Sequence, residues 1–144
     1  LDLAMHQRTG GVPFTLSSNL LAALSAALKH TDWTARHARI VRASRRLREQ
    51  LHEHGIAILA SGKDAAAAVI TIVLPGDIDS VALCDSLHRN CSLVGGESAY
   101  LVARNWIQLC LFGEFSETGI DTVAEQIAAQ IRSQRREHEK SSHG

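Results

Sequence analysis

Along the first third of the chain, hydrophobic residues recur every three or four positions, which is the period of an amphipathic helix. This pattern predicts one helix over residues 16–30 and a second over residues 33–54. Thr31 and Asp32 are suited to cap the start of the second helix, and Gly55 is typical of the position just after a helix end. The expected apolar faces consist of Leu16, Leu20, Leu21, Leu24, Ala27 and Leu28 in the first helix, and of Trp33, Ile40, Leu47 and Leu51 in the second.

Beyond residue 55 the pattern changes to the short runs and alternations that are typical of strands. Residues 56–59 form a short apolar run, and residues 67–74 form a β-branched run that predicts a buried strand ending at Pro75. Residues 91–94 are a further strand candidate, which Gly95 and Gly96 interrupt. Residues 105–112 alternate, with Ile107, Leu109 and Leu111 on one side and Trp106, Gln108, Cys110 and Phe112 on the other.

Two more helices complete the predicted order of elements. Asp79 or Ser80 starts a short helix, and Ser116 caps a last amphipathic helix that continues through Ile131. We therefore expect an α+β fold with two long N-terminal helices, followed by a small, mostly antiparallel sheet covered by helices. Residues 1–132 form one domain in this interpretation, and residues 133–144 form a solvated helix end and tail.

The composition restricts the class of protein and its partners. The 144 residues are 45% hydrophobic and 21% charged, which indicates a globular domain with its own core. Fifteen basic residues balance fifteen acidic ones, so the net charge favours neither nucleic acid nor an anionic membrane as partner. Three cysteines without CxxC spacing indicate reduced thiols and a cytoplasmic location. The first residue is Leu rather than Met, so we expect a piece of a longer protein.

Few side chains have a spacing that favours metal or nucleophilic chemistry. The pairs His30 and His37, and His52 and His54, lack the i,i+4 spacing that a metal site on a helix needs, so we expect no metal. Cys84 and Cys110 are expected in the core, and Cys91 is expected to be more open but structural. The lysines, Lys29, Lys63 and Lys140, lack the desolvated or positively charged surroundings that activate an amine, so we expect no catalytic residue among them.

The second helix has a dense basic face that admits several interpretations. It could be a solvated face, an inter-domain or subunit contact, or a surface for nucleic acid. Acidic residues follow at Glu49 and Glu53, and aromatic residues are not interleaved, so the solvated face is favoured. The arginines concerned are Arg36, Arg39, Arg42, Arg45, Arg46 and Arg48.

A turn rich in Gly and Pro precedes the first helix. Residues 8–21 read RTGGVPFTLSSNLL, so that Thr15 and the following hydroxyl side chains lie at a helix N-terminus. Such a segment either caps the helix or holds an anion such as a phosphate. The sequence of this segment alone leaves both interpretations open.

Residues 8–131 together resemble the C-terminal part of class V aminotransferases. These are fold-type I enzymes that use pyridoxal 5'-phosphate (PLP), such as the 2-aminoethylphosphonate, alanine–glyoxylate and serine–glyoxylate transaminases. The resemblance includes the Gly-Val-Pro-Phe-Thr segment ending at Thr15, the Arg-rich helix that ends at Gly55, the strand before Pro75, and the strand over residues 106–112 with its closing helix. Cysteine desulfurases are relatives of this family, but their catalytic Cys would fall in residues 95–100, which contain none.

The resemblance implies roles for three residues. Thr15 occupies the place of a Thr that reaches the cofactor phosphate of the neighbouring subunit. Gln108 occupies the place where the family usually has an Arg that binds the substrate carboxylate. A Gln cannot make that charged bidentate contact, so either Arg104 substitutes for it or the substrate differs.

The resemblance also implies partners that this chain does not contain. The lysine that carries the cofactor belongs to an N-terminal PLP-binding domain, and the active site lies at the interface of a homodimer. We therefore expect the C-terminal small domain of a PLP-dependent aminotransferase, which acts on a small amino acid or keto acid and is inactive alone. The alternatives are a non-catalytic α+β binding or dimerisation module, and an Arg-rich domain that contacts nucleic acid.

Overall fold

The computed structural model describes residues 17–89 and 94–141. Its contacts divide the chain into two units, Leu1–Arg36 and His37–Gly144. In the first unit, α2 (Ser18–His30) begins at Ser17, whose side chain accepts a hydrogen bond from the Leu20 N–H group. The Asp32 carboxylate accepts a hydrogen bond of 2.9 Å from the Ala35 N–H group at the start of α3 (Trp33–Glu53). Both helix starts therefore have the polar caps that their sequences predict.

The leucines of α2 form a hydrophobic face on a helix in which no residue is buried. Leu20, Leu21, Leu24 and Leu28 are each more than half exposed. At the end of the unit, the indole Nε1 of Trp33 donates a hydrogen bond of 3.1 Å to the carbonyl oxygen of Leu28. This bond lies within the first unit and spans residues 28–33.

The second unit is built on a three-stranded antiparallel sheet in the order β1–β3–β2. Its strands are β1 (Val69–Val73), β2 (Val94–Gly95) and β3 (Trp106–Cys110). The central strand β3 pairs Ile107 with Ile72 and Gln108 with Thr71. A single bridge from Ile58 to Ile72 adds the predicted apolar run 56–59 to the free edge of β1.

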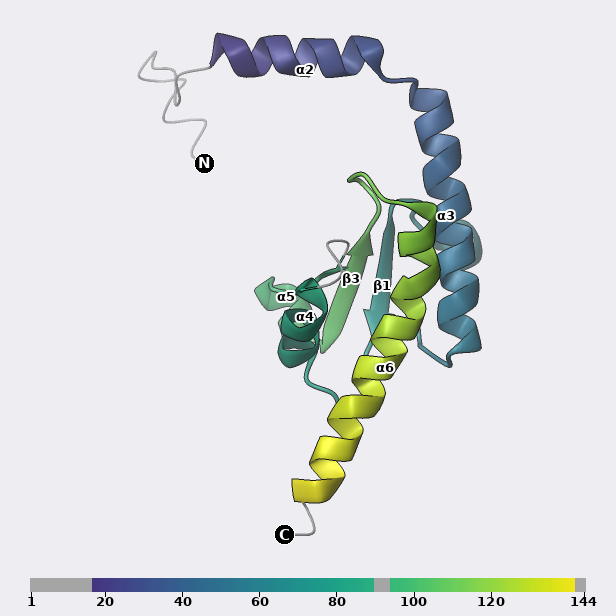
Figure 1. Ribbon diagram of the computed structural model, residues 1–144, viewed down its shortest axis with the longest axis vertical. Coiled ribbons are helices and arrows are strands. Elements are labelled where there is room, and N and C mark those ends of the chain that lie inside the picture. Colours follow the sequence, from purple (N-terminus) through teal and green to yellow (C-terminus); the bar gives the residue numbers. More distant parts are fainter. Residues whose placement is uncertain (1–16, 90–93, 142–144) are drawn as a thin grey trace. The chain divides into compact units, whose positions relative to one another are not determined.

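Three helices cover one face of this sheet. They are α3 from His37 onward, α4 (Ser80–His88) and α6 (Glu117–Ser141), and Figure 1 shows α3 and α6 side by side along the sheet, with α4 beside β3. Their apolar side chains meet those of the strands in one core. Its fully buried members are Leu47, Leu51, Ile70, Ile72, Leu83, Ile107, Leu109, Leu111, Ile120 and Ile127. This arrangement confirms the expected α+β class.

Most element boundaries follow from local chemistry. Gly55 has a φ of 69°, and the Ile56 N–H group bonds back to the carbonyl of Leu51, so α3 ends in the left-handed turn that its glycine predicts. Asp79 caps α4 through bonds to two backbone N–H groups. The Ser116 hydroxyl accepts a hydrogen bond of 2.9 Å from the Gly119 N–H group at the start of α6.

Four features differ from the sequence predictions or extend them. Gly95 pairs with Gln108 inside β2, so the expectation that Gly95 interrupts the strand was wrong; residues 90–93 lie outside the described part of the chain. A short helix, α5 (Ala99–Val102), precedes β3 and was not predicted. The last helix continues to Ser141, and its side chains from Arg135 to Lys140 are exposed. A 3₁₀ turn, Gly62–Asp64, lies between the segment 56–59 and β1.

Within residues 17–89 and 94–141, no helix is both long enough and apolar enough to cross a membrane.

Candidate functional site

The two faces of the sheet have different side chains. Residues 70, 72, 107 and 109 point to the helices and are buried, whereas the residues between them are only half-buried. This second face, which we call the outer face, contains Val69, Thr71, Val73, Trp106, Gln108 and Cys110. The buried residues of the strands form one core cluster with apolar side chains of α3, α4 and α6. The outer face is therefore where this unit can present polar side chains to a ligand.

Gln108 occupies the centre of the outer face. It lies on the middle strand, opposite Thr71 on one side and Gly95 on the other. Its Nε2 donates a hydrogen bond of 3.1 Å to the Thr71 hydroxyl. Gly95 has no side chain, and a Cβ placed on it meets no atom of the described residues within 4 Å. The expectation that strand alternation turns Gln108 away from the hydrophobic layer is confirmed.

Arg104 lies in the loop that leads into the same strand. Its guanidinium carbon is 3.8 Å from the centre of the Tyr100 ring and 5.6 Å from that of Trp106. The two rings meet edge to face with centroids 6.2 Å apart. One terminal nitrogen of Arg104 also donates to the carbonyl oxygen of Tyr100 at 3.3 Å. Cation–π contacts of this kind hold an exposed Arg over the rings and leave donors for an anion.

Trp106 connects these two polar groups. It follows Arg104 by two residues and precedes Gln108 by two, so Trp106 and Gln108 share the outer face. The chain therefore places a guanidinium, an indole and an amide in succession from the rim of the outer face to its centre. Such a set can bind a polar or negatively charged group, but it contains no general base or nucleophile.

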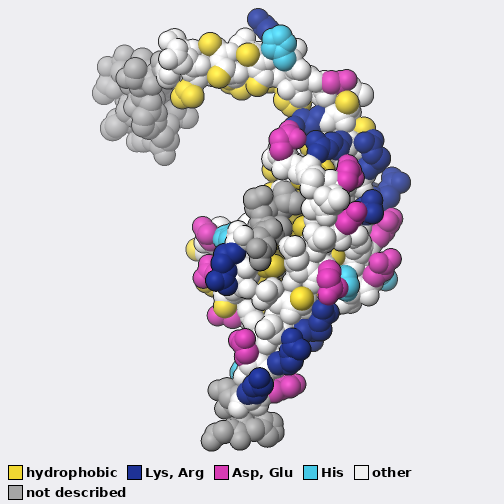
Figure 2. All heavy atoms as spheres, in the orientation of Figure 1, with side chains coloured by type: hydrophobic (Ala, Val, Ile, Leu, Met, Phe, Trp, Pro, Cys, Tyr) yellow, Lys and Arg dark blue, Asp and Glu magenta, His cyan; other side chains and the backbone are white. Residues whose placement is uncertain are grey.

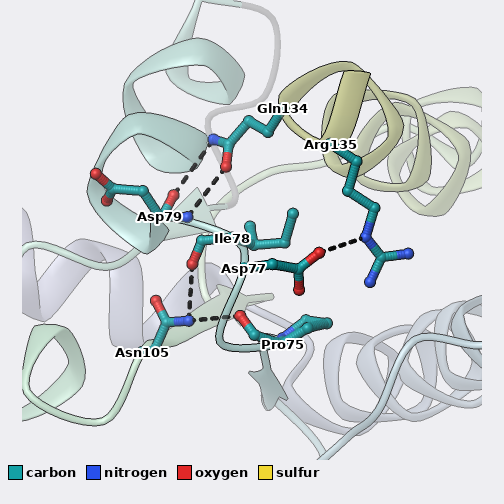
Figure 3. Close-up of polar contacts among 7 residues, drawn as sticks. All are labelled: Pro75, Asp77, Ile78, Asp79, Asn105, Gln134 and Arg135. Carbon is teal, nitrogen blue, oxygen red and sulfur yellow. Dashed lines mark hydrogen bonds and ion pairs between the residues drawn. The ribbon is translucent and has the colours of Figure 1, made fainter. Parts of the chain in front are cut away.

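Asn105 positions the entry to β3, and sequence reasoning missed it. It has a φ of 56°, which is a left-handed conformation that Asn tolerates better than most residues. Its side-chain nitrogen donates to the carbonyl oxygens of Pro75, at 2.9 Å, and Ile78, at 2.8 Å (Figure 3). Its side-chain oxygen accepts a bond of 3.1 Å from the Ser80 N–H group. The one sequence signal for this role was an Asn directly before a strand. Its hydrogen-bond partners could not be predicted from the sequence, because they lie 25 to 30 residues away along the chain.

The Pro75–Ser80 segment, which Asn105 contacts, also forms polar contacts with the last helix, α6. Gln134 on α6 accepts a hydrogen bond of 3.0 Å from the Asp79 N–H group and donates one of 3.3 Å to its carbonyl oxygen. Arg135 binds Asp77 at 2.8 Å, and this contact lowers the pKa of the Asp77 carboxyl group (Figure 3). These polar contacts explain why residues 133–135 belong to the folded unit.

The basic face of α3 is largely used inside the unit. Arg48 donates to the carbonyl oxygens of Ala60, Ala66 and Val69 at 2.7 to 3.1 Å, and burial lowers the pKa of its guanidinium. These bonds join α3 to the loop before β1 and to the first residue of β1. The arginine is therefore a structural support rather than a free ligand-binding group.

Two further arginines of this face contact the segment around α6. Arg39 binds Glu114 at 3.1 Å and the carbonyl oxygen of Phe115, and it stacks on the Phe115 ring. Arg46 binds Asp121 at 2.6 Å. Contacts within the unit therefore account for half of the arginines that suggested a nucleic-acid surface.

Cysteine and lysine side chains are placed as follows. Cys84 is buried, and burial together with Asp85 and Glu97 raises the pKa of its thiol to about 11, so it stays protonated at neutral pH. Cys110 lies half-buried on the outer face, which corrects its expected core position. The described part of the chain contains no group of three or more His, Cys, Asp and Glu side chains that could hold a metal ion. Lys29, Lys63 and Lys140 are all exposed.

Thr15, the expected phosphate contact, lies outside the described residues, as does Cys91. The structure therefore brings Gln108 and Arg104 to one region but does not test Thr15. No protein-family model matches the sequence, and no curated protein matches it. The resemblance to class V aminotransferases accordingly stays a prediction from the sequence.

Proposed function

We propose that this chain is the C-terminal small domain of a PLP-dependent, class V-like aminotransferase, which closes over the active site and contributes to a homodimer. The observation that carries the proposal is the position of Gln108. It lies at the centre of the outer face, on the strand that the resemblance assigns to substrate binding.

In this proposal the chain binds and orients the substrate. The Arg104 guanidinium, held over Tyr100, offers charged donors to a substrate oxyanion, and the Gln108 amide offers a neutral donor and acceptor. A neutral amide in place of Arg favours a substrate group other than a lone carboxylate, or leaves the carboxylate to Arg104. The amino-group transfer itself is chemistry that PLP supplies in such enzymes.

The described residues do not form a PLP site by themselves. The three lysines are exposed and occupy a helix, a turn and a helix end. An amine that reacts with the cofactor needs desolvation or a neighbouring positive charge to lower its pKa. We therefore assign the cofactor lysine to a separate N-terminal domain of a parent enzyme and expect no transaminase activity from this chain alone.

The proposal is tested by two substitutions in the longest natural form of the protein. We expect Arg104→Ala to lower kcat/KM for the amino donor at least tenfold, a loss of about 1.4 kcal/mol of transition-state binding, and Gln108→Ala to lower it by a similar factor. Arg89→Ala serves as a matched control, because Arg89 is exposed beyond the end of α4. An absence of PLP absorbance in that protein, or unchanged kinetics in both variants, contradicts the proposal.

A second candidate is a non-catalytic dimerisation module. The observation that favours it is the apolar face of α2, whose leucines are more than half exposed on a helix without acidic residues in its first turn. An exposed apolar face of this kind is typical of an interaction surface. A stable dimer that binds no PLP in light scattering and absorbance measurements would support this candidate over the enzyme.

A further inference from the structure

A cavity of about 250 Å³ lies between α6, the end of α3 and the end of β1. Its floor is apolar and includes Ile56, Val73, Pro75 and Ile131. Neither Gln108 nor Arg104 is among its lining residues. Val73 is the one residue of the outer face that lines the cavity, so the cavity is distinct from the region that contains Gln108 and Arg104.

The backbone around the floor offers few free donors. The N–H groups of Ile56, Val73 and Leu74 already donate to carbonyl oxygens of the chain, at 2.9 to 3.1 Å. Pro75 has no N–H group. A ligand that enters the cavity therefore meets apolar side chains below and finds its polar partners among the side chains of the rim.

The titratable residues that line the cavity are all basic. They are His54, at the end of α3, and Arg132 and Arg135 on α6. Figure 2 shows basic side chains gathered over the C-terminal half of α6. Basic side chains over an apolar floor favour a ligand that has an apolar body and a negatively charged end.

The carboxylates that neutralise these groups lie outside the lining. Glu125 contacts Arg132 at 2.7 Å and His54 at 3.4 Å, and Asp77 contacts Arg135 at 2.8 Å (Figure 3). Each arginine contact engages one guanidinium nitrogen, and a guanidinium has five N–H donors. The arginines can therefore keep their ion pairs and still donate to an oxyanion in the cavity.

We propose that this cavity binds a small amphiphilic anion, namely a carboxylate on a short aliphatic body. The aliphatic body lies on the floor formed by Ile56, Val73 and Ile131, and the carboxylate meets Arg132 and Arg135. The volume is slightly below the range of about 300 to 1,000 Å³ that is usual for ligand pockets, which restricts the body to a few carbons. The inference rests on this cavity alone and does not depend on the proposed aminotransferase role.

The test is an NMR titration of the full chain with hexanoate, followed on backbone amides and arginine side chains. We expect saturable shifts that centre on Ile56, Val73 and Arg132. Hexanamide has a similar body without the charge, and inorganic phosphate has the charge without the body. We expect each to bind at least about tenfold more weakly than hexanoate, because each lacks one of the two contacts. Equal binding of either probe, or shifts scattered over the surface, overturns the proposal.

Amino-acid substitutions test separately how the basic rim and the space inside the cavity contribute to hexanoate binding. Arg132→Gln should weaken hexanoate binding about tenfold, since a charge-assisted hydrogen bond is lost. Arg136→Gln is the matched control, because Arg136 is an exposed residue of the same helix that does not line the cavity. Ala57→Leu fills the cavity from an exposed lining position and should abolish the shifts. Unchanged binding in Arg132→Gln or Ala57→Leu, in variants with an unchanged circular dichroism spectrum, contradicts the assignment.

Discussion

The two faces of the sheet consist of alternate residues of the same strands, yet they differ in what their side chains contact. On the covered face, Ile72, Ile107 and Leu109 are fully buried under three helices. On the outer face, Thr71 and Gln108 bond to each other at a half-buried position. Packing therefore explains the residues of the covered face, whereas the polar pair on the outer face has no packing role that requires it.

This difference predicts how substitutions on the two faces change the stability of the unit. A buried Leu or Ile contributes stability through the apolar surface that it removes from water, and any loss of volume is costly. A half-buried Gln–Thr pair contributes at most the net value of one neutral hydrogen bond. Substitutions on the two faces should therefore differ first in their effect on unfolding.

The largest effect is expected from Leu109→Ala at the centre of the covered face. Leu109 is fully buried on the middle strand, so its truncation removes apolar contacts and leaves a cavity. We expect the free energy of unfolding to fall by about 4 kcal/mol, within the usual range for buried Leu→Ala changes. Urea denaturation followed by circular dichroism measures this loss. A loss below about 1 kcal/mol would mean that the covered face is not the core.

A smaller loss is expected from Asn105→Ala, at the point where the chain enters β3. The change removes three side-chain bonds to the Pro75–Ser80 segment and leaves a residue with a Cβ in a left-handed conformation. We expect a loss of about 3 kcal/mol in the free energy of unfolding.

Asn105→Gly is the matched control, since Gly accepts the positive φ but lacks the amide. It should be the less destabilising of the two by about 1 kcal/mol. If it destabilises as much as Asn105→Ala, the backbone conformation contributes nothing.

The adjacent residues Gly95 and Gly96 allow a further test of the difference between the two faces of the sheet. A Cβ on Gly96 would clash with Cys84 Sγ on the covered side, whereas a Cβ on Gly95 meets no atom of the described residues within 4 Å. We expect Gly96→Ala to lower the free energy of unfolding by about 2 kcal/mol through overpacking, and Gly95→Ala to change it little. Adding Cys84→Ala to Gly96→Ala should recover part of the loss, since it removes the clashing sulfur. Equal effects of the two glycine changes would contradict this difference between the faces.

The fold was largely predictable because its signals are local. The caps at Asp32, Asp79 and Ser116 and the turn at Gly55 depend on contacts within a few residues, and the alternation over residues 105–112 fixes which side is buried. Pairing at Gly95 was missed because glycine has a low strand propensity, and its place in β2 depends on the partner strand.

The candidate site was predictable only in part. Alternation placed Gln108 on the outer face, but the stacking of Arg104 on Tyr100 depends on α5, which has only four residues and no clear periodicity. The bonds of Asn105, Gln134 and Arg48 join residues that are 12 to 55 positions apart, and no local pattern encodes them. The basic cavity was missed for the same reason, since its rim combines the end of α3 with the C-terminal half of α6.

The smallest effect is expected from Gln108→Ala, and it provides the strictest test of the outer face. The substitution removes one hydrogen bond, so the free energy of unfolding should fall by at most about 1 kcal/mol. Thr71→Val should cost a similar amount, and the double variant should cost no more than about the larger of the two, because both changes remove the same bond. Urea denaturation of the three variants measures the coupling. A loss for Gln108→Ala as large as that for Leu109→Ala would show that Gln108 is part of the core and would remove the structural support for a substrate-binding role. A small loss is the result that the proposed substrate-binding role of Gln108 requires.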